Sequence, residues 1–280
     1  MTGTRRVART AGLPTALAWE LRKLAAQARS RYTLLGCAVA PVLIVLVLDG
    51  QQRTPKDNLY GRQAHASGFA VALLVLTFCA QWLFPLVTSV VAGDIFASED
   101  QHGTWKTILT RSLSRATVFW AKVLASFAFA TTALVLLATS VIVSSILVVG
   151  SQPLTGLGGQ LVPGRRALDL TIASWALALP PLLGFTALAI LLSVLTRNSS
   201  VAVVAPLVLG FVMQLVGSLG GVDLLRRGLL TTPFESWHGL LALPDFGHVV
   251  VEGAVVSTCW LVTCLSVAFV SLRRRDITGG

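Results

Sequence analysis

The chain has 280 residues, of which 54% are apolar and only 12% are charged, and its formal net charge is +10. A soluble globular domain carries about 25% charged residues, so this composition excludes an ordinary soluble domain. In a soluble protein such a positive charge would suggest nucleic acid as a partner. In a membrane protein it reports topology instead, and no nucleic-acid partner is expected.

The stretch over residues 14–32, PTALAWELRKLAAQARSRY, has the pattern of an amphipathic helix. Apolar residues recur at helical spacing at Leu17, Leu21, Leu24 and Ala28. The basic residues fall mostly off that stripe, and Trp19 is of the type that anchors at membrane surfaces. The pattern predicts a basic helix in the membrane interface, with its cations near anionic lipid headgroups. A solvated helical tail is the alternative.

Six long apolar stretches follow, each nearly free of charged residues. They cover residues 32–48, 68–92, 121–149, 171–195, 201–219 and 251–271. About 20 helical residues cross the hydrocarbon core of a bilayer. Only helices or closed barrels satisfy their backbone there, and the stretches lack the period-two alternation of barrel strands. We therefore predict an all-α, polytopic membrane protein with six transmembrane helices. It forms one transmembrane domain over 1–280, with tails at 1–31 and 272–280 around a bundle at 32–271.

The distribution of basic residues predicts the orientation. With a cytoplasmic N-terminus, 15 of the 22 basic residues lie in cytoplasmic segments and 7 lie outside. The fifteen are Arg5, Arg6, Arg9, Arg22, Lys23, Arg29, Arg31, Lys106, Arg111, Arg115, Lys122, Arg197, Arg273, Arg274 and Arg275. The positive-inside rule favours this arrangement. We predict a multi-pass protein of the cell membrane with both termini in the cytoplasm.

The connection over residues 94–120 is the longest predicted cytoplasmic loop between spans. Gly103 breaks it, and Thr104 can cap the helix that follows. Trp105, Ile108 and Leu109 share one face of that helix because they stand at positions i, i+3 and i+4. A short amphipathic helix between two spans has to dock either on the membrane surface or on a cytoplasmic partner.

Three further connections differ in character. Residues 150–170 are rich in glycine and are expected to be irregular and extracellular. Residues 196–200 leave room only for a tight helical hairpin. Residues 220–250 are too apolar for a solvated loop and too interrupted for a span, so they predict a re-entrant or interfacial helical hairpin on the outer side.

Catalytic and metal-binding patterns are not found. The four histidines, His65, His102, His238 and His248, all lie outside the predicted spans, and the sequence contains neither HExxH nor CxxC. Gly159 and Gly164 have the spacing of a phosphate-binding loop, but Arg165 and Arg166 stand where Lys and Ser or Thr are needed. We expect no catalytic residue, no metal site and no ATP hydrolysis by this chain. The four cysteines, Cys37, Cys79, Cys259 and Cys264, fall in spans and predict no disulfides.

The loop carries a series of residues in a defined order. It runs Glu99, Gly103-Thr104, Ile108-Leu109-Thr110-Arg111, Ser114-Arg115 and then Lys122 at the start of a span. This series resembles the first cytoplasmic loop of ABC type-2 transporter permeases, except that Ser112 stands where proline is common. The N-terminal helix with Glu20 and Lys23, the six spans, the broken outer segment and the basic end at 273–275 agree with the resemblance, which covers essentially the whole chain.

The resemblance implies the permease subunit of an ATP-driven ABC exporter. Two cytoplasmic ABC ATPase subunits would bind ATP and Mg, so this chain itself needs no cofactor. A second permease copy or a homologous permease would complete a dimer surrounded by membrane lipids. The helix after Gly103 would be the coupling helix, and the implied ATPase contacts are Glu99, Gly103, Thr104, Trp105, Ile108, Leu109 and Arg111.

Polar residues inside two spans are candidates for the substrate path. They are Thr77, Gln81 and Thr88 in the second span, and Gln214 and Ser218 in the fifth. Polar groups in a membrane face a bundle interior or a cavity, and in the resembled family these two spans line the dimer cavity. The alternative is that they only join helices, at about 0.6 kcal/mol each.

No charge lies deep in a span, which argues against coupling to protons or sodium. The cargo expected is an apolar or amphipathic compound such as a drug, antibiotic, lipid or peptide, as in multidrug efflux. Two other functions stay open at this point: an integral membrane enzyme, and a non-transporting membrane scaffold or immunity protein.

Overall fold

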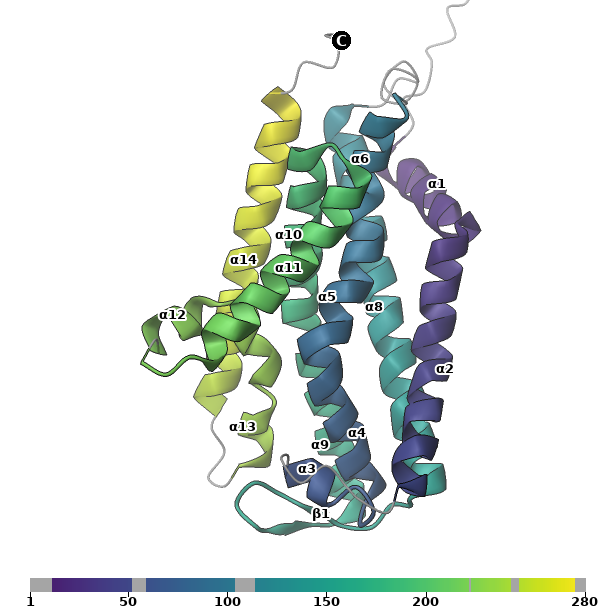
Figure 1. The fold of residues 1–280 in the computed structure, drawn as a ribbon. Helices are drawn as coiled ribbons and strands as arrows, with labels where there is room; N and C mark the ends of the chain where they lie inside the picture. The colour runs from purple at the N-terminus through teal and green to yellow at the C-terminus, as the bar shows by residue number, and fades with distance from the viewer. Residues whose placement is uncertain (1–11, 52–58, 104–113, 222, 243–246, 275–280) are drawn as a thin grey trace, which may run out of the picture.

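In the computed structural model the chain forms a bundle of long helices (Figure 1), described over residues 12–51, 59–103, 114–221, 223–242 and 247–274. The first half contains α1 (Leu13–Ala26), α2 (Ala28–Gly50), α3 (Leu59–Arg62), α4 (Gly68–Phe78), the π-helical turn η1 (Cys79–Leu83), α5 (Phe84–Thr88), a second π-helical turn η2 (Ser89–Gly93), α6 (Asp94–Gln101) and α8 (Arg115–Val148). The second half contains β1 (Leu154–Thr155), β2 (Leu161–Val162), α9 (Gly164–Leu177), α10 (Leu179–Thr196), α11 (Ser199–Ser218), α12 (Asp223–Gly228), the 3-10 turn η3 (Thr232–Glu235), α13 (His238–Leu241) and α14 (Gly247–Arg274).

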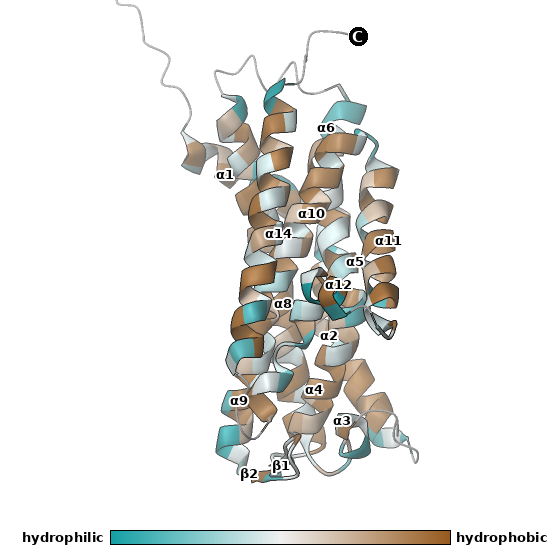
Figure 2. Ribbon diagram, turned by 90° about the vertical axis from the view of Figure 1, so that its left-hand side faces the viewer, coloured by the Kyte–Doolittle hydropathy of each residue, from teal (hydrophilic) through white to brown (hydrophobic). Residues whose placement is uncertain are grey.

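Six helical segments among the described residues are long and apolar enough to cross a membrane. They are Ala28–Gly50, Gly68–Gln101, Arg115–Val148, Gly164–Thr196, Ser199–Ser218 and Gly247–Arg274. Four contain the predicted stretch completely, and the two that end at Val148 and Ser218 stop one residue short of it, so the all-α class and the six helices able to span a membrane are confirmed. Hydrophilic residues gather toward the two ends of the bundle, near α1 and α6 and near β1 and β2 (Figure 2). We call these the α1 end and the β1 end.

The helices pack around α10, which contacts α14, α11, α8, α5 and α6. On the other side α2 and α1 lie along α8. One crossing is very close: a Cβ on Gly93 would lie 2.4 Å from the backbone oxygen of Ala202. Only glycine at this position lets η2 approach α11 so closely.

The second span is not a uniform α-helix. Pro85 has no N–H, so the carbonyl of Gln81 loses its α-helical partner, and the π-helical turn η1 lies directly before it. Its last bond joins the N–H of Phe84 to the oxygen of Cys79. After η2, the N–H groups of Phe96 and Ala97 in α6 both donate to the Ser193 hydroxyl on α10, at 3.0 Å. Wide turns of this kind change which residues share a helix face.

The connection over residues 150–170 is more ordered than the sequence predicted. β1 and β2 pair antiparallel, and α9 already begins at Gly164. The hairpin is fixed to the rest of the protein, since the Leu157 N–H and the Gln160 side chain both donate to the Leu241 oxygen, at 3.0 and 3.1 Å. The prediction of an irregular loop was wrong here because these bonds to α13 join residues far apart in the chain.

The apolar segment over residues 220–250 forms three short turns, α12, η3 and α13, rather than a span. Phe234 and Trp237 are buried, and their rings contact Phe84 and Tyr60 at centroid distances of 5.4 and 5.7 Å. Burial raises the pKa of the Tyr60 phenol, which therefore stays neutral. The interruption predicted from the sequence is confirmed, while its position relative to a membrane stays a prediction.

The tight hairpin predicted at residues 196–200 is confirmed. α10 ends at Thr196 and α11 begins at Ser199. Arg197 adopts a left-handed conformation with φ of 54°, and the Asn198 side chain caps α11 by accepting from the Val201 N–H at 3.2 Å. Arg197 is the one non-glycine residue with positive φ in the described part of the chain.

Candidate functional site

The predicted coupling loop leaves and rejoins the bundle at the α1 end, at residues that the structure describes. Thr104, Trp105, Ile108, Leu109 and Arg111 lie outside the described residues. Gly103 has a φ of +62° and open space around its Cα, so it ends the helical turn after α6 as the sequence predicted. Ser114 caps α8 by accepting from the Thr117 N–H at 3.0 Å.

A buried ion cluster lies beside the two ends of this loop. We define the charge cluster as Glu20, Lys23, Glu99 and Lys122. The Lys122 ammonium lies 2.9 Å from a carboxylate oxygen of Glu20 and 3.1 Å from one of Glu99. Glu99 also pairs with Lys23. The cluster therefore connects α1, α6 and α8, the helices on either side of the loop.

Burial makes the cluster energetically important. Lys122 is 0% exposed and Glu99 is 4% exposed, while Lys23 keeps about half of its side chain in contact with solvent. The Lys122 ammonium also lies 5.8 Å from the centre of the Phe96 ring. Removing one partner of a buried ion pair leaves an uncompensated charge and costs about 3–5 kcal/mol.

The same four residues carried part of the family resemblance in the sequence. Each was identified separately, by its order in the chain, and nothing in the sequence indicated that they meet. Glu99 was implied as an ATPase contact, and the structure places its carboxylate against two lysines of its own chain. A contact between Glu99 and a partner would thus be indirect, through the helices that the cluster joins.

A second ion pair at the α1 end was not foreseen from the sequence. Arg29, at the start of α2, pairs with Asp94 at the start of α6, and the Ser199 hydroxyl donates to the same carboxylate. Asp94 is 3% exposed. The pair ties the first turn of α11 to α2 and α6, so the α1 end of four spans is linked through two carboxylates.

The face that α1 turns toward the bundle differs from the apolar stripe predicted from the sequence. Leu24 is buried and Leu17 packs against the core, but Leu21 is exposed and Glu20 points to α8 instead. The attraction between Glu20 and Lys122 accounts for this rotation of α1. Trp19 and Leu21, on the two flanks of Glu20, are exposed.

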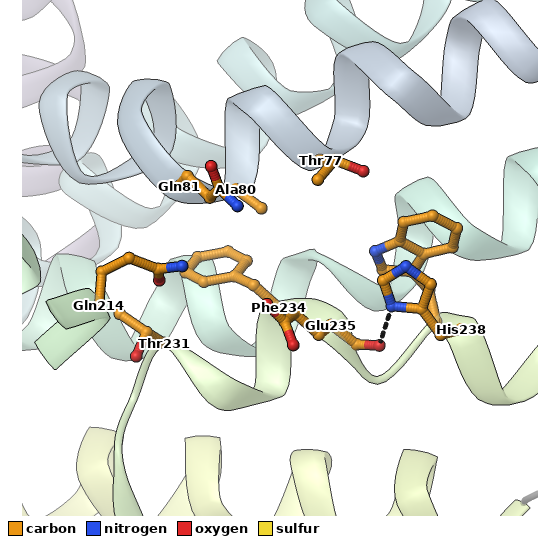
Figure 3. Close-up of a pocket in the computed structure, with 9 residues that line it drawn as sticks. Thr77, Ala80, Gln81, Gln214, Thr231, Phe234, Glu235 and His238 are labelled. Carbon is orange, nitrogen blue, oxygen red and sulfur yellow. Dashed lines mark hydrogen bonds between the residues drawn. The ribbon is translucent and has the colours of Figure 1, made fainter. Parts of the chain in front are cut away.

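Three of the five substrate-path candidates meet in one hollow between η1, α11 and the η3–α13 segment. Thr77, Gln81 and Gln214 line it together with Thr231, Phe234, Glu235, Trp237 and His238, around a space of about 260 Å³ that includes its open mouth. Figure 3 shows Thr77 and Gln81 on one side of the hollow and Gln214, Phe234 and His238 on the other. The His238 ring nitrogen lies 2.8 Å from the Glu235 backbone oxygen.

The other two candidates do not reach this hollow. Thr88 is buried, and its hydroxyl donates to the Phe84 and Pro85 oxygens of its own helix, at 3.0 and 3.1 Å. Ser218 is exposed at the end of α11 and donates to the Leu215 oxygen. The π-helical turn η1 lies between Thr77 and Thr88 and removes Thr88 from the face on which the sequence placed it.

The hollow combines amide and hydroxyl groups with aromatic rings, as small-molecule sites do, but in this conformation it has room for only about one water molecule. The η3–α13 segment supplies Phe234, Glu235 and His238, which sequence reasoning did not select. The one feature of the sequence that could have pointed to these residues is the apolar segment over 220–250, which is too interrupted to be a span. Among the described residues no group of three or more His, Cys, Asp or Glu side chains is placed to hold a metal ion.

Residues 16–217 match the profile of a family described as ABC-2 family transporter protein. The match covers well over half of the 280-residue chain. None of the curated proteins compared with the chain matches it.

Proposed function

Because the chain belongs to the ABC-2 transporter family, as a membrane subunit without an ATPase domain, we propose that it is the permease of an ATP-driven exporter. In this proposal two separate ATPase subunits bind ATP and Mg at the cytoplasmic face. A second copy of this chain or a homologous permease completes the transporter. The cargo is an apolar or amphipathic compound such as a drug, antibiotic, lipid or peptide.

The observation that carries the proposal is the arrangement of the charge cluster around the predicted coupling loop. The loop leaves the bundle two residues after α6 and returns at α8, and the cluster joins these two helices to α1. A force applied to the loop would therefore move α1, α6 and α8 as one unit. Arg29 and Asp94 extend this unit to α2.

The hollow supports the second half of the proposal, the cargo path. It lies between α11 and the second span, far from the α1 end, and its wall includes the η3–α13 segment. η1, α5, η2 and α6 follow one another without interruption in the second span. A displacement of α6 would therefore reach the side of the hollow that η1 forms. The π-helical turns are the deformable points in that connection.

The direct test of the proposal is association with an ATPase. The ATPase genes nearest to the gene for this chain are coexpressed with it, and the tagged chain is purified in nanodiscs. We expect an ATPase to copurify, and its ATP turnover to respond to the presence of the permease. If no ABC ATPase of the same genome copurifies, the exporter proposal is wrong.

Replacing either glutamine of the hollow should change transport. We expect Gln81→Leu and Gln214→Leu to alter the relative transport of amphipathic compounds by roughly two- to tenfold, since each removes one hydrogen-bonding group. Resistance of cells to a panel of such compounds measures the change. Thr88→Val is the matched control in the same span, because its hydroxyl bonds only within its own helix. Equal loss of expression in both glutamine variants, without any change in preference, would identify them as packing residues.

The orientation can be tested by labelling single cysteines. We place them at Thr2, Gly158 and Gly279 in a cysteine-free background and treat intact cells with an impermeant thiol reagent. Only the cysteine at position 158 should react, because the basic residues favour a cytoplasmic location for both termini. Labelling at position 2 or 279 would contradict this orientation.

A further inference from the structure

An open groove lies between the ends of α10 and α14 at the α1 end, away from the charge cluster and from the hollow. It is lined by Leu195, Arg197, Ser266, Val267, Val270, Ser271 and Arg274, around a space of about 1010 Å³ that includes its open mouth. α10 and α14 pack against each other along their length, so the groove is formed by rigid elements.

The two arginines of the groove differ from three cations at this end whose charges are already neutralised. Lys23, Arg29 and Lys122 are all paired with carboxylates. No carboxylate of the described residues lies within ion-pair distance of Arg197 or Arg274. The groove therefore presents two positive charges that this part of the chain does not neutralise, and it favours an anion.

The backbone at Arg197 supports a role for its side chain. The residue closes the turn between α10 and α11 with a φ of 54°. Glycine adopts such a conformation without strain, whereas a residue with a Cβ is strained there. An arginine at this position lowers the stability of the turn and adds a charge to the groove.

The remaining wall of the groove is apolar and belongs to the membrane-spanning part of the chain. Leu195, Val267 and Val270 are exposed, within segments able to cross a membrane. The Ser266 and Ser271 hydroxyls also line the groove. A ligand that fits has an anionic group at one end and hydrocarbon at the other.

We propose that this groove binds an anionic phospholipid, with its phosphate between Arg197 and Arg274 and an acyl chain along Val267 and Val270. Guanidinium groups bind phosphate oxygens in a bidentate manner, and basic pockets between helices on the cytoplasmic side suit such headgroups. A second copy of the chain fits less well, since a twofold contact would bring the same arginines together. An ATPase surface would meet the arginines but not the apolar wall within the membrane.

The test is lipid binding by the purified chain in a non-ionic detergent, measured by native mass spectrometry. The probes are phosphatidylglycerol, phosphatidylcholine with the same acyl chains, and inorganic phosphate. We expect phosphatidylglycerol to bind preferentially, and its affinity to fall roughly thirtyfold in the Arg197→Gly/Arg274→Gln double variant. Arg197→Gly suits the backbone of the turn, so its thermal midpoint without lipid should be equal to or above that of the wild type.

The control removes two charges elsewhere. The double variant Arg226→Gln/Arg227→Gln on α12 removes two arginines that are paired with Glu235 and Glu252. This variant should keep the preference for phosphatidylglycerol. Equal affinity for phosphatidylglycerol in the groove variant and the wild type would overturn the proposal. So would equal binding of both lipids by the wild type, or full competition by inorganic phosphate. Loss of ATPase association with unchanged lipid binding would assign the groove to the ATPase instead.

Discussion

Lys122→Met should strongly lower the stability of the folded protein, so that most of the chain is no longer folded. The ammonium of Lys122 is fully buried and is shared by Glu20 and Glu99, at 2.9 and 3.1 Å. Methionine has similar length and removes only the charge, so the two carboxylates would face each other without their common partner. A loss of about 3–5 kcal/mol is expected for breaking a buried pair, which is a large fraction of the stability of most domains. Thermal unfolding in detergent, followed by tryptophan fluorescence, measures the loss.

Two further variants separate the charge effect from packing. Lys122→Met combined with Glu20→Gln and Glu99→Gln replaces the buried ions by neutral groups and should recover most of the stability. Lys23→Met alone should cost no more than about 1 kcal/mol, because that side chain is half exposed and screened by solvent. If Lys122→Met unfolds at the same temperature as the wild type in the same detergent, the cluster does not stabilise the fold as described.

Trp105→Ala should abolish most of the coupling to an ATPase while leaving the protein folded. Trp105, Ile108 and Leu109 form the apolar face predicted for the helix after Gly103, in a connection too short to bury that face itself. Full burial of one large side chain contributes about 1.5–3 kcal/mol, and aromatic residues dominate interfaces. A decrease in ATPase association of roughly tenfold or more is expected. Copurification and transport-coupled ATP turnover in nanodiscs measure it.

The matched controls lie in the same loop. Arg111→Ala removes a charge at the rim of the predicted contact and should weaken association much less. Gly103→Pro should act like Trp105→Ala, since proline cannot adopt the φ of +62° found at this turn. If Trp105→Ala couples normally, the helix after Gly103 is not the coupling helix. The thermal midpoint of each loop variant should equal that of the wild type. A loss of coupling is thereby distinguished from the loss of stability expected for Lys122→Met.

The sequence alone located the six segments that are long and apolar enough to cross a membrane. The thickness of the hydrocarbon core sets the length of a span, and the absence of water inside it requires helices, so charge-free apolar stretches suffice to find them. The same local logic found the break at Gly103, the tight turn at residues 196–200 and the interrupted segment over 220–250. Each of these depends on neighbours in the chain, and each agrees with the structure.

The contacts between distant residues were decided only by the tertiary structure. Lys122 and Glu99 stand 23 positions apart, and Glu20 comes from another helix, so no local pattern reports that their charges meet in a buried site. The π-helical turn before Pro85 changes the helix face, which is why Thr77 and Gln81 line the hollow with Gln214 while Thr88 does not. Sequence periodicity assumes a constant number of residues per turn. Where a π-helical turn changes that number, only the three-dimensional structure shows which side chains share a face.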